Sequence, residues 1–589
     1  MASKLTEKAN KKRIRQWIVS ISLAFAVASI AAPRTAAAAS VGSPGDPANA
    51  EAKVTIVGNH PAEAASFTNG PEIASAQTLR MEVVLALHDR PALDALIAAQ
   101  QDRSSPQYHQ WMTPAEFNAR FGPTQSDVSA VSSWLSGQGF TVEPQSQPMR
   151  KIVFSGAAAS AESAFGVKIH TDSTQKLYSN LNDPIVPKSI SSMVASIRGL
   201  SNLAHAQPAI ELSPDFSAVP DVKIGKVTHF GPNDLYTFYD ETPPTSSSNN
   251  GTGTDCIALI EDSDFDNGSV NAFDGEFAVA SFSPTRVLSD GSDPGEVGND
   301  ATEALLDVEY AHAAAPGVPI TAYIGNSAVS GNGVLDAGLN AVSDNTCGAI
   351  SISFSFCGEP GTFYTGEIDP LAAQAASQGQ AVFASSGDYG AAGLVLGSQN
   401  TCVAGTSRNV SELSADPNIT AVGGTQFKPH YKKGVDSGST RESVWKDKIG
   451  SGGGGESGVF PKPSYQSGLI STDSNRDVPD VSLAASPLHP GFFLGYQSAI
   501  FCCIGGTSLS APYWAGIAQL AAQKAGATRV GPLNATLYSI ASGGSIRDVT
   551  KGNNTFHKVT GFKATVGYDR GSGLGTPDIN NLTSAIAAH

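Results

Sequence analysis

The chain has 589 residues, of which 41% are hydrophobic and 15% charged, and 37 basic against 53 acidic side chains give a formal net charge of −16. This length indicates more than one domain, and the composition is that of a folded chain. The acidic balance makes nucleic acid a poor partner and argues against stable membrane association.

The first 39 residues have the features of an export signal. Basic side chains come first, an apolar run covers residues 17–32, and small residues near Ala39 offer a cleavage site. The apolar run is shorter than the roughly 20 residues that a spanning helix needs, so we expect a cleaved signal and not a membrane anchor. This predicts a secreted protein, extracellular or periplasmic.

Residues 47–203 alternate strand-like runs (81–88, 151–156 and 166–171) with helical ones (90–101 and 125–140). This pattern predicts a small α+β domain with an antiparallel sheet. Residues 204–227 are rich in Pro, Ser and Asp and have little periodicity, which predicts an exposed linker.

From residue 228 to residue 589, short apolar runs alternate with Ala-rich helical stretches. The runs cover 256–261, 320–325, 349–356, 381–388 and 419–425. Continuous apolar strands between helices predict an α/β domain whose parallel sheet is covered by helices on both faces. In such sheets, sites form at the carboxyl ends of the strands.

A glycine-rich run covers residues 451–458 (SGGGGESG). It lacks the GK[ST] ending of a phosphate-binding loop, so a flexible loop beside the substrate is the better interpretation.

Six cysteines lie in the second part of the chain, at positions 256, 347, 357, 402, 502 and 503. In an exported protein some of them can pair, but the sequence does not choose the pairing. A bond between the adjacent Cys502 and Cys503 would be strained, so we expect each to have a different partner. The sequence contains no CxxC pair of the kind that indicates a zinc site.

The stretch GGTSLSAPYWAG places Ser508 between a glycine-lined turn and an apolar helix. A serine hydroxyl needs a base to become a nucleophile. The eleven histidines are scattered, and none lies in an HGTH-like setting. His312, in EYAHAAAPG, is expected just after a helix.

The carboxylates are better candidates. Glu303 and Asp307 are four residues apart, and on a helix they share one face. A solvated acidic face is the alternative, but the residues between them are apolar, and two carboxyls in poor solvent do best by sharing a proton. Asp388 follows an apolar strand in SSGDYG; alone, it is best explained as a turn aspartate.

Taken together, these segments resemble the sedolisin family of serine-carboxyl peptidases. EALLDVE, SISFSF, ASSGDYG, VGGTQF, DVPDVSLAASP and GGTSLSAP occur in the order of that family, and residues 47–203 resemble its activation prodomain through SSPQYHQWMTPAEFNARFGPTQSDV and IVFSGAAASAESAFGVKIH. The resemblance implies a subtilisin-like fold in which a glutamate replaces the histidine base.

The resemblance also implies catalytic roles. Ser508 matches the nucleophile, Glu303 the general base, Asp307 the partner that holds the base, and Asp388 the acid that stabilises the oxyanion. At about pH 4 a histidine is protonated and cannot accept a proton, whereas a carboxylate can. Glu261 matches a further glutamate in the hydrogen-bond chain that runs through the acidic pair in this family.

One departure from the family concerns the residue that ends this hydrogen-bond chain. Phe354 stands where the family often has a hydrogen-bonding tryptophan, so the pH optimum cannot be carried over.

The tail resembles the family's calcium loop and implies one structural calcium ion. Asp548 and Asp569 would supply carboxylates, and Val549, Thr565 and Gly567 backbone carbonyls. Thr565 replaces a usual glycine, which matters little if only its carbonyl binds. Two ordinary turn aspartates are the alternative.

These features predict a secreted zymogen of an acid-acting endopeptidase. Its partners would be protein or peptide substrates and its own prodomain, an intramolecular inhibitor released by self-cleavage within residues 204–227; we expect a monomer. Three alternatives stay open: a tripeptidyl exopeptidase of the same family, a histidine-dependent subtilase active at neutral pH, and a catalytically inactive binding protein on the same fold.

Overall fold

The computed structural model describes residues 51–144, 150–218, 229–397, 400–428, 431–432, 435–436, 441–470 and 473–589, so the predicted export signal lies outside the described residues. Residues Ala52–His589 form one compact unit. No helix in these ranges is long and apolar enough to cross a bilayer.

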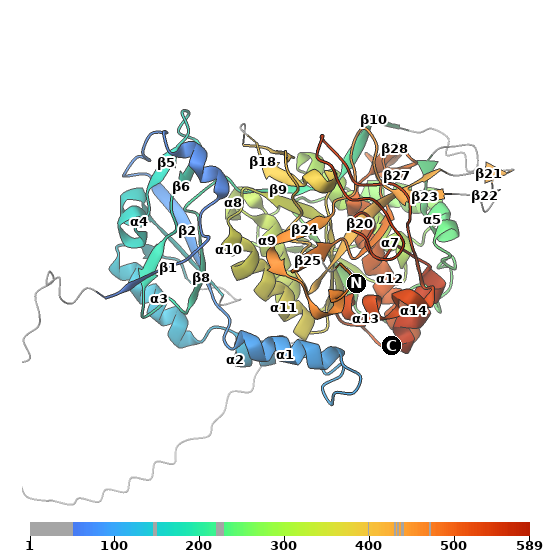
Figure 1. The fold of residues 1–589 in the computed structure, drawn as a ribbon, viewed down its shortest axis with the longest axis horizontal. Helices are drawn as coiled ribbons and strands as arrows, with labels where there is room; N and C mark the ends of the chain where they lie inside the picture. The colour runs from blue at the N-terminus through green and yellow to red at the C-terminus, as the bar shows by residue number, and fades with distance from the viewer. Residues whose placement is uncertain are drawn as a thin grey trace, which may run out of the picture. The chain divides into compact units, whose positions relative to one another are not determined.

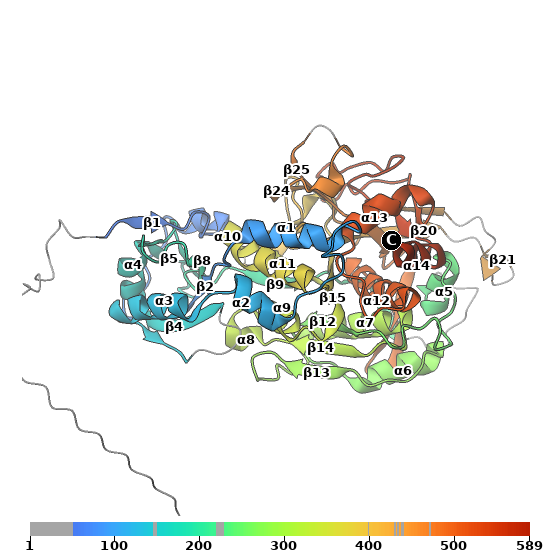
Figure 2. The same cartoon turned by 90° about the horizontal axis from the view of Figure 1, so that it is seen from below.

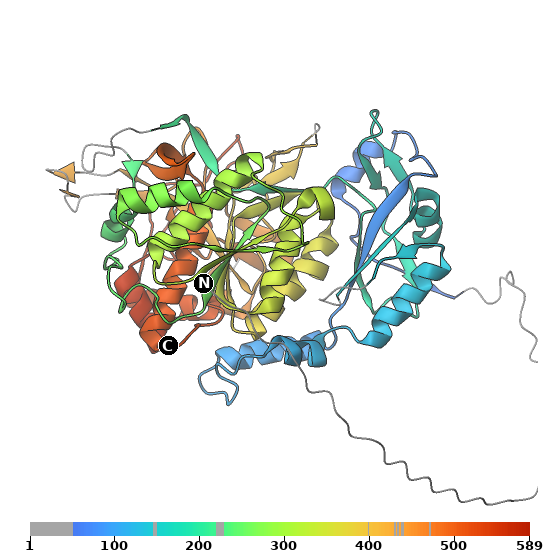
Figure 3. The same cartoon turned by 180° about the vertical axis from the view of Figure 1, so that it is seen from behind.

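The first part of the chain forms the predicted antiparallel sheet, with strand order β3-β4-β2-β8. Its strands are β3 (Thr141–Val142), β4 (Lys151–Ala157), β2 (Thr78–Leu85) and β8 (Val194–Arg198). Helices α3 (Gln125–Gly137) and α4 (Ala158–Phe165) share a buried core with this sheet (Figure 3). The predicted strand at 166–171 is only β5 (Ile169–Thr171), which pairs with β6 (Tyr178–Asn180) outside this sheet.

The second part contains the predicted parallel sheet, with strand order β13-β14-β12-β15-β17-β20-β23 and β26 beside β20. Strands β20 and β23 are labelled in Figure 1, and β13, β14, β12 and β15 in Figure 2. The strands are β13 (Thr285–Leu288), β14 (Ile320–Ile324), β12 (Cys256–Glu261), β15 (Cys347–Ile352), β17 (Ala381–Ser385), β20 (Ile419–Lys428), β23 (Arg441–Val444) and β26 (Val481–Ala484). Only β23 runs antiparallel to its neighbour among these described pairs.

Helices cover both faces of this sheet, as predicted. Ile257 and Leu259 of β12 belong to one core, with residues of α7 (Gly298–Ala314) and α12 (Thr507–Ala525). The alternate residues Ala258 and Ile260 belong to a second core, with α9 (Gly333–Asp344) and α11 (Asp369–Ser377). Successive side chains of a strand point to opposite faces, so burial of both sets requires two helical layers. Figure 2 shows these helices from below.

The remaining helices connect and cover these sheets. Their bounds are α1 (Arg90–Gln101), α2 (Pro114–Phe121), α5 (Pro232–Phe238), α6 (Asn267–Phe277), α8 (Ser327–Ser330), α10 (Gly361–Phe363), α13 (Asn534–Ile540) and α14 (Ile579–Ala588).

The predicted strand 349–356 is divided in two. β15 ends at Ile352, and β16 (Phe354–Cys357) leaves the parallel sheet to pair antiparallel with β9 (His205–Pro208). A further sheet has the order β10-β28-β27-β11, from β10 (Glu211–Ala218), β28 (Ala499–Gly505), β27 (Gly491–Tyr496) and β11 (His229–Phe230).

The prediction of an exposed linker at 204–227 is therefore wrong for residues 204–213, whereas most of residues 214–218 are exposed as predicted. This segment forms β9 and β10, and Ala209 between them is only 5% exposed. The Pro- and Ser-rich sequence of this segment shows no alternation that would predict strands. Its strands form because backbone groups of β9 and β10 pair with the edges of β16 and β28.

The cysteines form three disulfides, Cys256–Cys347, Cys357–Cys402 and Cys502–Cys503. The expectation of separate partners for Cys502 and Cys503 is wrong. Cys256 and Cys347 lie opposite each other on β12 and β15, and Cys357 is bonded to Cys402. The only cysteine left as a partner for Cys502 is therefore Cys503.

Candidate active site

The four predicted catalytic side chains come from three places in the fold. Glu303 and Asp307 lie one turn apart on α7, Asp388 follows the carboxyl end of β17, and Ser508 is the second residue of α12. Their residues are at most 2% exposed. The alternative of a solvated acidic face is therefore excluded for the α7 pair.

Ser508 sits where β28 turns into α12. The turn passes through Gly506, whose φ of +127° is rarely adopted by residues with a side chain. The Ser508 hydroxyl donates to the carbonyl oxygen of Ser353 over 3.4 Å. The Ser353 hydroxyl in turn donates to Asp307 Oδ1 over 2.8 Å. Ser353 thus connects the serine to the acidic pair.

Burial dominates the titration of the acidic cluster. It raises the pKa of Glu303 well above its usual range, repulsion from Asp307 adds to this, and the nearby Ser508 hydroxyl acts in the opposite direction. Burial raises the pKa of Asp307 to about 8. Glu261, at the end of β12, is fully buried, and burial and then Asp307 raise its pKa. Three neighbouring carboxyls in a dry site share protons and do not titrate independently.

Asp388 is held by the residue before the serine. Its Oδ1 accepts hydrogen bonds from the backbone N–H and the hydroxyl of Thr507, both at 2.8 Å. Burial raises the pKa of Asp388 to about 7, so its carboxyl is neutral in acid. Oδ2 has no partner among the described residues, which leaves it free to donate a proton to a ligand.

Residues 205–212 run through the site. The Ala209 N–H donates to the Ser353 carbonyl over 2.9 Å, and the Ala209 carbonyl accepts from the Ser508 N–H over 3.2 Å. A Cβ placed on Gly506 would lie 2.2 Å from the Ala209 oxygen and 2.7 Å from Asp388 Oδ2. The Ala209 carbonyl oxygen and Asp388 Oδ2 therefore lie on either side of the same small space beside Gly506. The Ala209 carbonyl thus lies close to both Ser508 and Asp388.

The glycine-rich run 451–458 is not a flexible loop, so this prediction is wrong. Ser451 donates its N–H to the Asp388 carbonyl over 2.9 Å, and Gly453 donates to the Gly387 carbonyl over 2.7 Å. A Cβ on Gly453 would lie 2.0 Å from the Ser386 carbonyl oxygen. Glycine is needed here for close backbone approach in a buried wall beside Asp388.

The predicted position of His312 just after a helix is wrong. His312 lies inside α7 and not after it; the helix continues to Ala314 because the following residues are buried too. Its ring stacks on Phe282, and burial lowers its pKa to about 4. In the described part of the chain no histidine is hydrogen-bonded to Ser508.

The proposed calcium ligands come from two loops that the structure brings together. Asp548 Oδ2 accepts from the Gly567 N–H, and Asp569 Oδ2 accepts from the Thr565 N–H, each over 2.8 Å. Asp569 Oδ1 accepts from two further backbone N–H groups, and Val549 is buried. The Ser572 hydroxyl lies 3.4 Å from the Val549 carbonyl oxygen and 3.2 Å from Asp569 Oδ1, so one carbonyl and one carboxylate oxygen, the ligand type that calcium prefers, lie close together here.

Two residues of the site were missed from the sequence, Ser353 and Thr507. Ser353 lies at the break between β15 and β16, and Thr507 is the third residue of the GGTS motif. A polar residue directly after a buried strand was a usable signal for Ser353, since such positions carry sites in parallel sheets.

Comparison with known proteins gives matches over most of the chain. A model of the pro-kumamolisin activation domain matches residues 65–203. Sedolisin of Pseudomonas sp. (strain 101) is 29% identical over 97% of this chain and 96% of its own. Kumamolisin of Bacillus sp. (strain MN-32) is 28% identical over 91% of this chain and 96% of its own. A solved structure of Pseudomonas sedolisin, a serine-carboxyl proteinase complexed with pseudo-iodotyrostatin, matches with a TM-score of 0.53 and 28% identity, covering 61% of this chain and 98% of that one.

Proposed function

Because this chain belongs to the sedolisin family of serine-carboxyl peptidases and carries a pro-kumamolisin activation domain, we propose that it is a secreted, acid-acting endopeptidase made as a self-processing zymogen. Its substrates are proteins or peptides, and residues 47–203 act as an intramolecular inhibitor until acid releases them.

In the proposed reaction, the Ser508 hydroxyl attacks the substrate carbonyl carbon while Glu303 accepts its proton. Asp307 positions and polarises Glu303 and is itself held by the Ser353 hydroxyl. Protonated Asp388 and the Ser508 N–H stabilise the oxyanion. Glu303 then returns the proton to the leaving amine, which gives an acyl-enzyme, and water activated by Glu303 hydrolyses it.

The observation that carries this proposal is the contact between Ala209 and Ser508. The chain holds the Ala209 carbonyl at the N–H of its own nucleophile, as a substrate would be held, and β9 and β10 flank it as strands on either side. We therefore assign Ala209–Ile210 as the bond that the zymogen cuts in itself.

The same segment favours an endopeptidase over a tripeptidyl peptidase. Four residues before Ala209, from His205 to Pro208, pair with β16, and the chain continues beyond them. A site that releases tripeptides must stop its substrate after three residues to recognise a free amino group. The pairing along β16 extends past this limit.

The pH range of activity rests on two buried carboxyls with opposite requirements. Glu303 must be ionised to accept the serine proton although burial raises its pKa, so it sets the acid limit. Asp388 must be protonated to donate, and its pKa of about 7 keeps it so in acid. Between the first and second parts of the chain, Arg198 lies 3.6 Å from Glu367, whose pKa is raised by burial, and this ion pair weakens when Glu367 is protonated. Acid would thus activate the site and loosen the inhibitor together.

We also propose one structural calcium ion, held by Asp548, Val549, Thr565, Gly567 and Asp569. A bound calcium ion would neutralise two carboxylates and hold the two tail loops against each other. No step of the reaction uses it.

The decisive test follows the purified precursor from neutral pH to about pH 4. We expect release of the first part and a mature amino terminus at Ile210, measured by intact mass and terminal sequencing. Ser508→Ala precursor, incubated alone, should stay whole. If Ser508→Ala is processed at the wild-type rate, self-processing is wrong, and a different terminus would refute the assigned bond alone. Release of tripeptides from a long peptide would favour the exopeptidase.

A further inference from the structure

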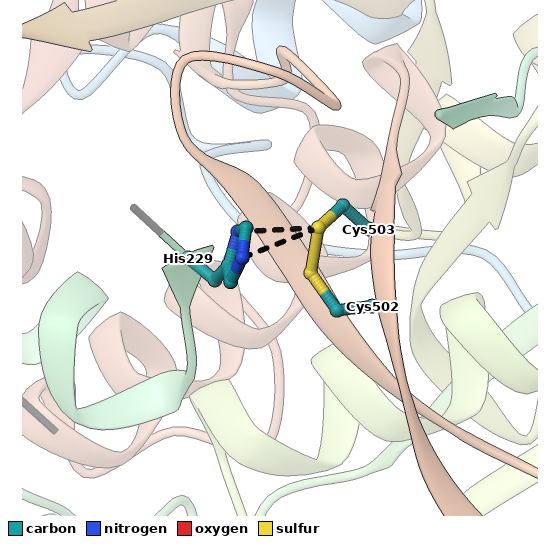
Figure 4. Close-up of side chains that lie close together, drawn as sticks. All are labelled: His229, Cys502 and Cys503. Carbon is teal, nitrogen blue, oxygen red and sulfur yellow. Dashed lines mark hydrogen bonds between the residues drawn. A yellow bond between two sulfur atoms is a disulfide. The ribbon is translucent and has the colours of Figure 1, made fainter. Parts of the chain in front are cut away.

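A histidine and the disulfide between neighbouring cysteines lie together outside the candidate active site. The Cys503 Sγ lies 3.1 Å from His229 Nδ1 and 3.7 Å from Nε2 (Figure 4). One ring nitrogen of His229 and the two sulfur atoms lie within 4.8 Å of one another. Among the described residues this is the only group of three such side chains close enough to share a metal ion.

The backbone directs Cys503 toward His229. Phe492 pairs with Ile504 and Phe493 with Cys502, so Cys503 is the extra residue of a β-bulge in β28. On β27, a Cβ at Gly491 would lie 2.4 Å from the Cβ of Cys503, so only glycine leaves room for it. His229 reaches the same place from β11, where it pairs with Gly491. Three adjacent strands thus hold the donor atoms in position.

In the oxidised form the sulfur atoms are bonded to each other and offer no thiolate. We propose that Cys502, Cys503 and His229 form a redox-gated site for a soft divalent cation, closed as the disulfide and opened by a small-molecule thiol. Two thiol molecules are oxidised to one disulfide, and their two electrons and two protons convert the Cys502–Cys503 bond into two thiols. A cation then displaces both thiol protons and binds two thiolates and the neutral imidazole.

The chemistry of the donor set selects the cation. Thiolate sulfur favours soft or borderline ions such as Cd²⁺ or Zn²⁺ over calcium, and imidazole suits the same ions. Protons compete for all three donors, so binding belongs to neutral pH and fails in acid. The site is independent of the proposed calcium loops, whose donors are oxygen atoms only.

The test uses full-length precursor carrying Ser508→Ala so that the chain stays intact. The protein is reduced with dithiothreitol, freed of it without air, and titrated with Cd²⁺ at about pH 7.5, where thiolate–Cd²⁺ charge-transfer absorption reports sulfur ligation. We expect about one Cd²⁺ bound per chain and release of about two protons. Unreduced protein should show no such absorption.

Two variants separate this site from the other disulfides. Cys502→Ser/Cys503→Ser keeps the other four cysteines and should lose the absorption. His229→Ala keeps both thiols and should weaken Cd²⁺ binding by at least the roughly 10- to 100-fold that loss of an outer partner costs at metal sites. Undiminished binding by Cys502→Ser/Cys503→Ser would overturn the proposal. So would peptide mapping in which dithiothreitol opens other disulfides but leaves Cys502–Cys503 intact, or unchanged affinity in His229→Ala.

Discussion

The backbone N–H of Ser508 donates a hydrogen bond to the carbonyl oxygen of Ala209 over 3.2 Å. The chain therefore presents one of its own peptide bonds to the proposed nucleophile, between two strands that pair with β16 and β28. In the proposed zymogen this segment would be bound in the manner of a substrate, so inhibition and first cleavage would involve the same contacts.

Gly506→Ala should stop self-processing. The new methyl would lie 2.2 Å from the Ala209 oxygen and 2.7 Å from Asp388 Oδ2, in a backbone conformation that already disfavours alanine. We expect at least a roughly 100-fold slower appearance of mature enzyme on gels, as for loss of an oxyanion donor. Gly468→Ala, also at positive φ but in open space, is the control and should process normally. Equal rates for the two variants would contradict the geometry.

Glu303→Gln should lower kcat by about 100- to 10,000-fold at every acid pH, because glutamine cannot accept the serine proton. The matched control is Glu309→Gln. Glu309 lies on the same helix and is equally buried, but its partner is the Gly495 N–H, away from Ser508. Because Glu303→Gln should also fail to process itself, the first part of each variant is removed by an added protease before steady-state kinetics are measured. Full activity of Glu303→Gln would point back to a histidine-dependent enzyme.

Asp388→Asn should change the pH profile more than the maximal rate. Asparagine can keep the acceptor for Thr507 and still donate to the oxyanion at any pH. Wild-type activity should fall as pH rises through about 7, where Asp388 ionises, whereas the variant should keep its activity there. Asp388→Ala should lose about 100- to 1,000-fold below about pH 7, where wild-type Asp388 is protonated and donates to the oxyanion. If Asp388→Asn loses activity above about pH 7 in the same way as the wild type, Asp388 does not stabilise the oxyanion.

The folded precursor should lose stability as pH rises from about 5 to 8. Burial raises the pKa of Asp388 to about 7 and that of Asp307 to about 8, so in this window the native state binds more protons than the unfolded chain. Stability from such groups is complete below the unfolded pKa and disappears as pH rises through the folded pKa. Thermal melts of Ser508→Ala measure this, and adding Asp388→Asn should flatten the slope. A melting temperature that climbs toward pH 8 would refute it.

Calcium should raise the melting temperature, and a chelator should reverse the effect. A ligand at 100 times its Kd stabilises the folded state by about 2.7 kcal/mol, which is several degrees for most domains. Asp548→Asn should abolish the response. Asp293→Asn removes another exposed aspartate that accepts a backbone N–H and should leave the response intact. If Asp548→Asn still responds fully, the calcium site lies elsewhere.

Local pattern was sufficient for much of the fold. Continuous apolar runs predicted the strands of the parallel sheet, because a strand buried on both faces cannot alternate. The spacing of Glu303 and Asp307 predicted a shared helix face, and their apolar neighbours predicted burial. These properties depend on residues within a few positions of one another.

The sequence by itself determined the order of motifs, the helix that carries the acidic pair and the serine turn. Only the tertiary structure decided that residues 205–212 run through the site, that Ser353 bridges Ser508 and Asp307, that the glycine-rich run is a buried wall, and that Cys502 pairs with Cys503. Ser353 and Ser508 are 155 positions apart. Contacts between residues so far apart in the sequence depend on which strand edges remain unpaired after the core has packed. The local sequence pattern does not contain that information.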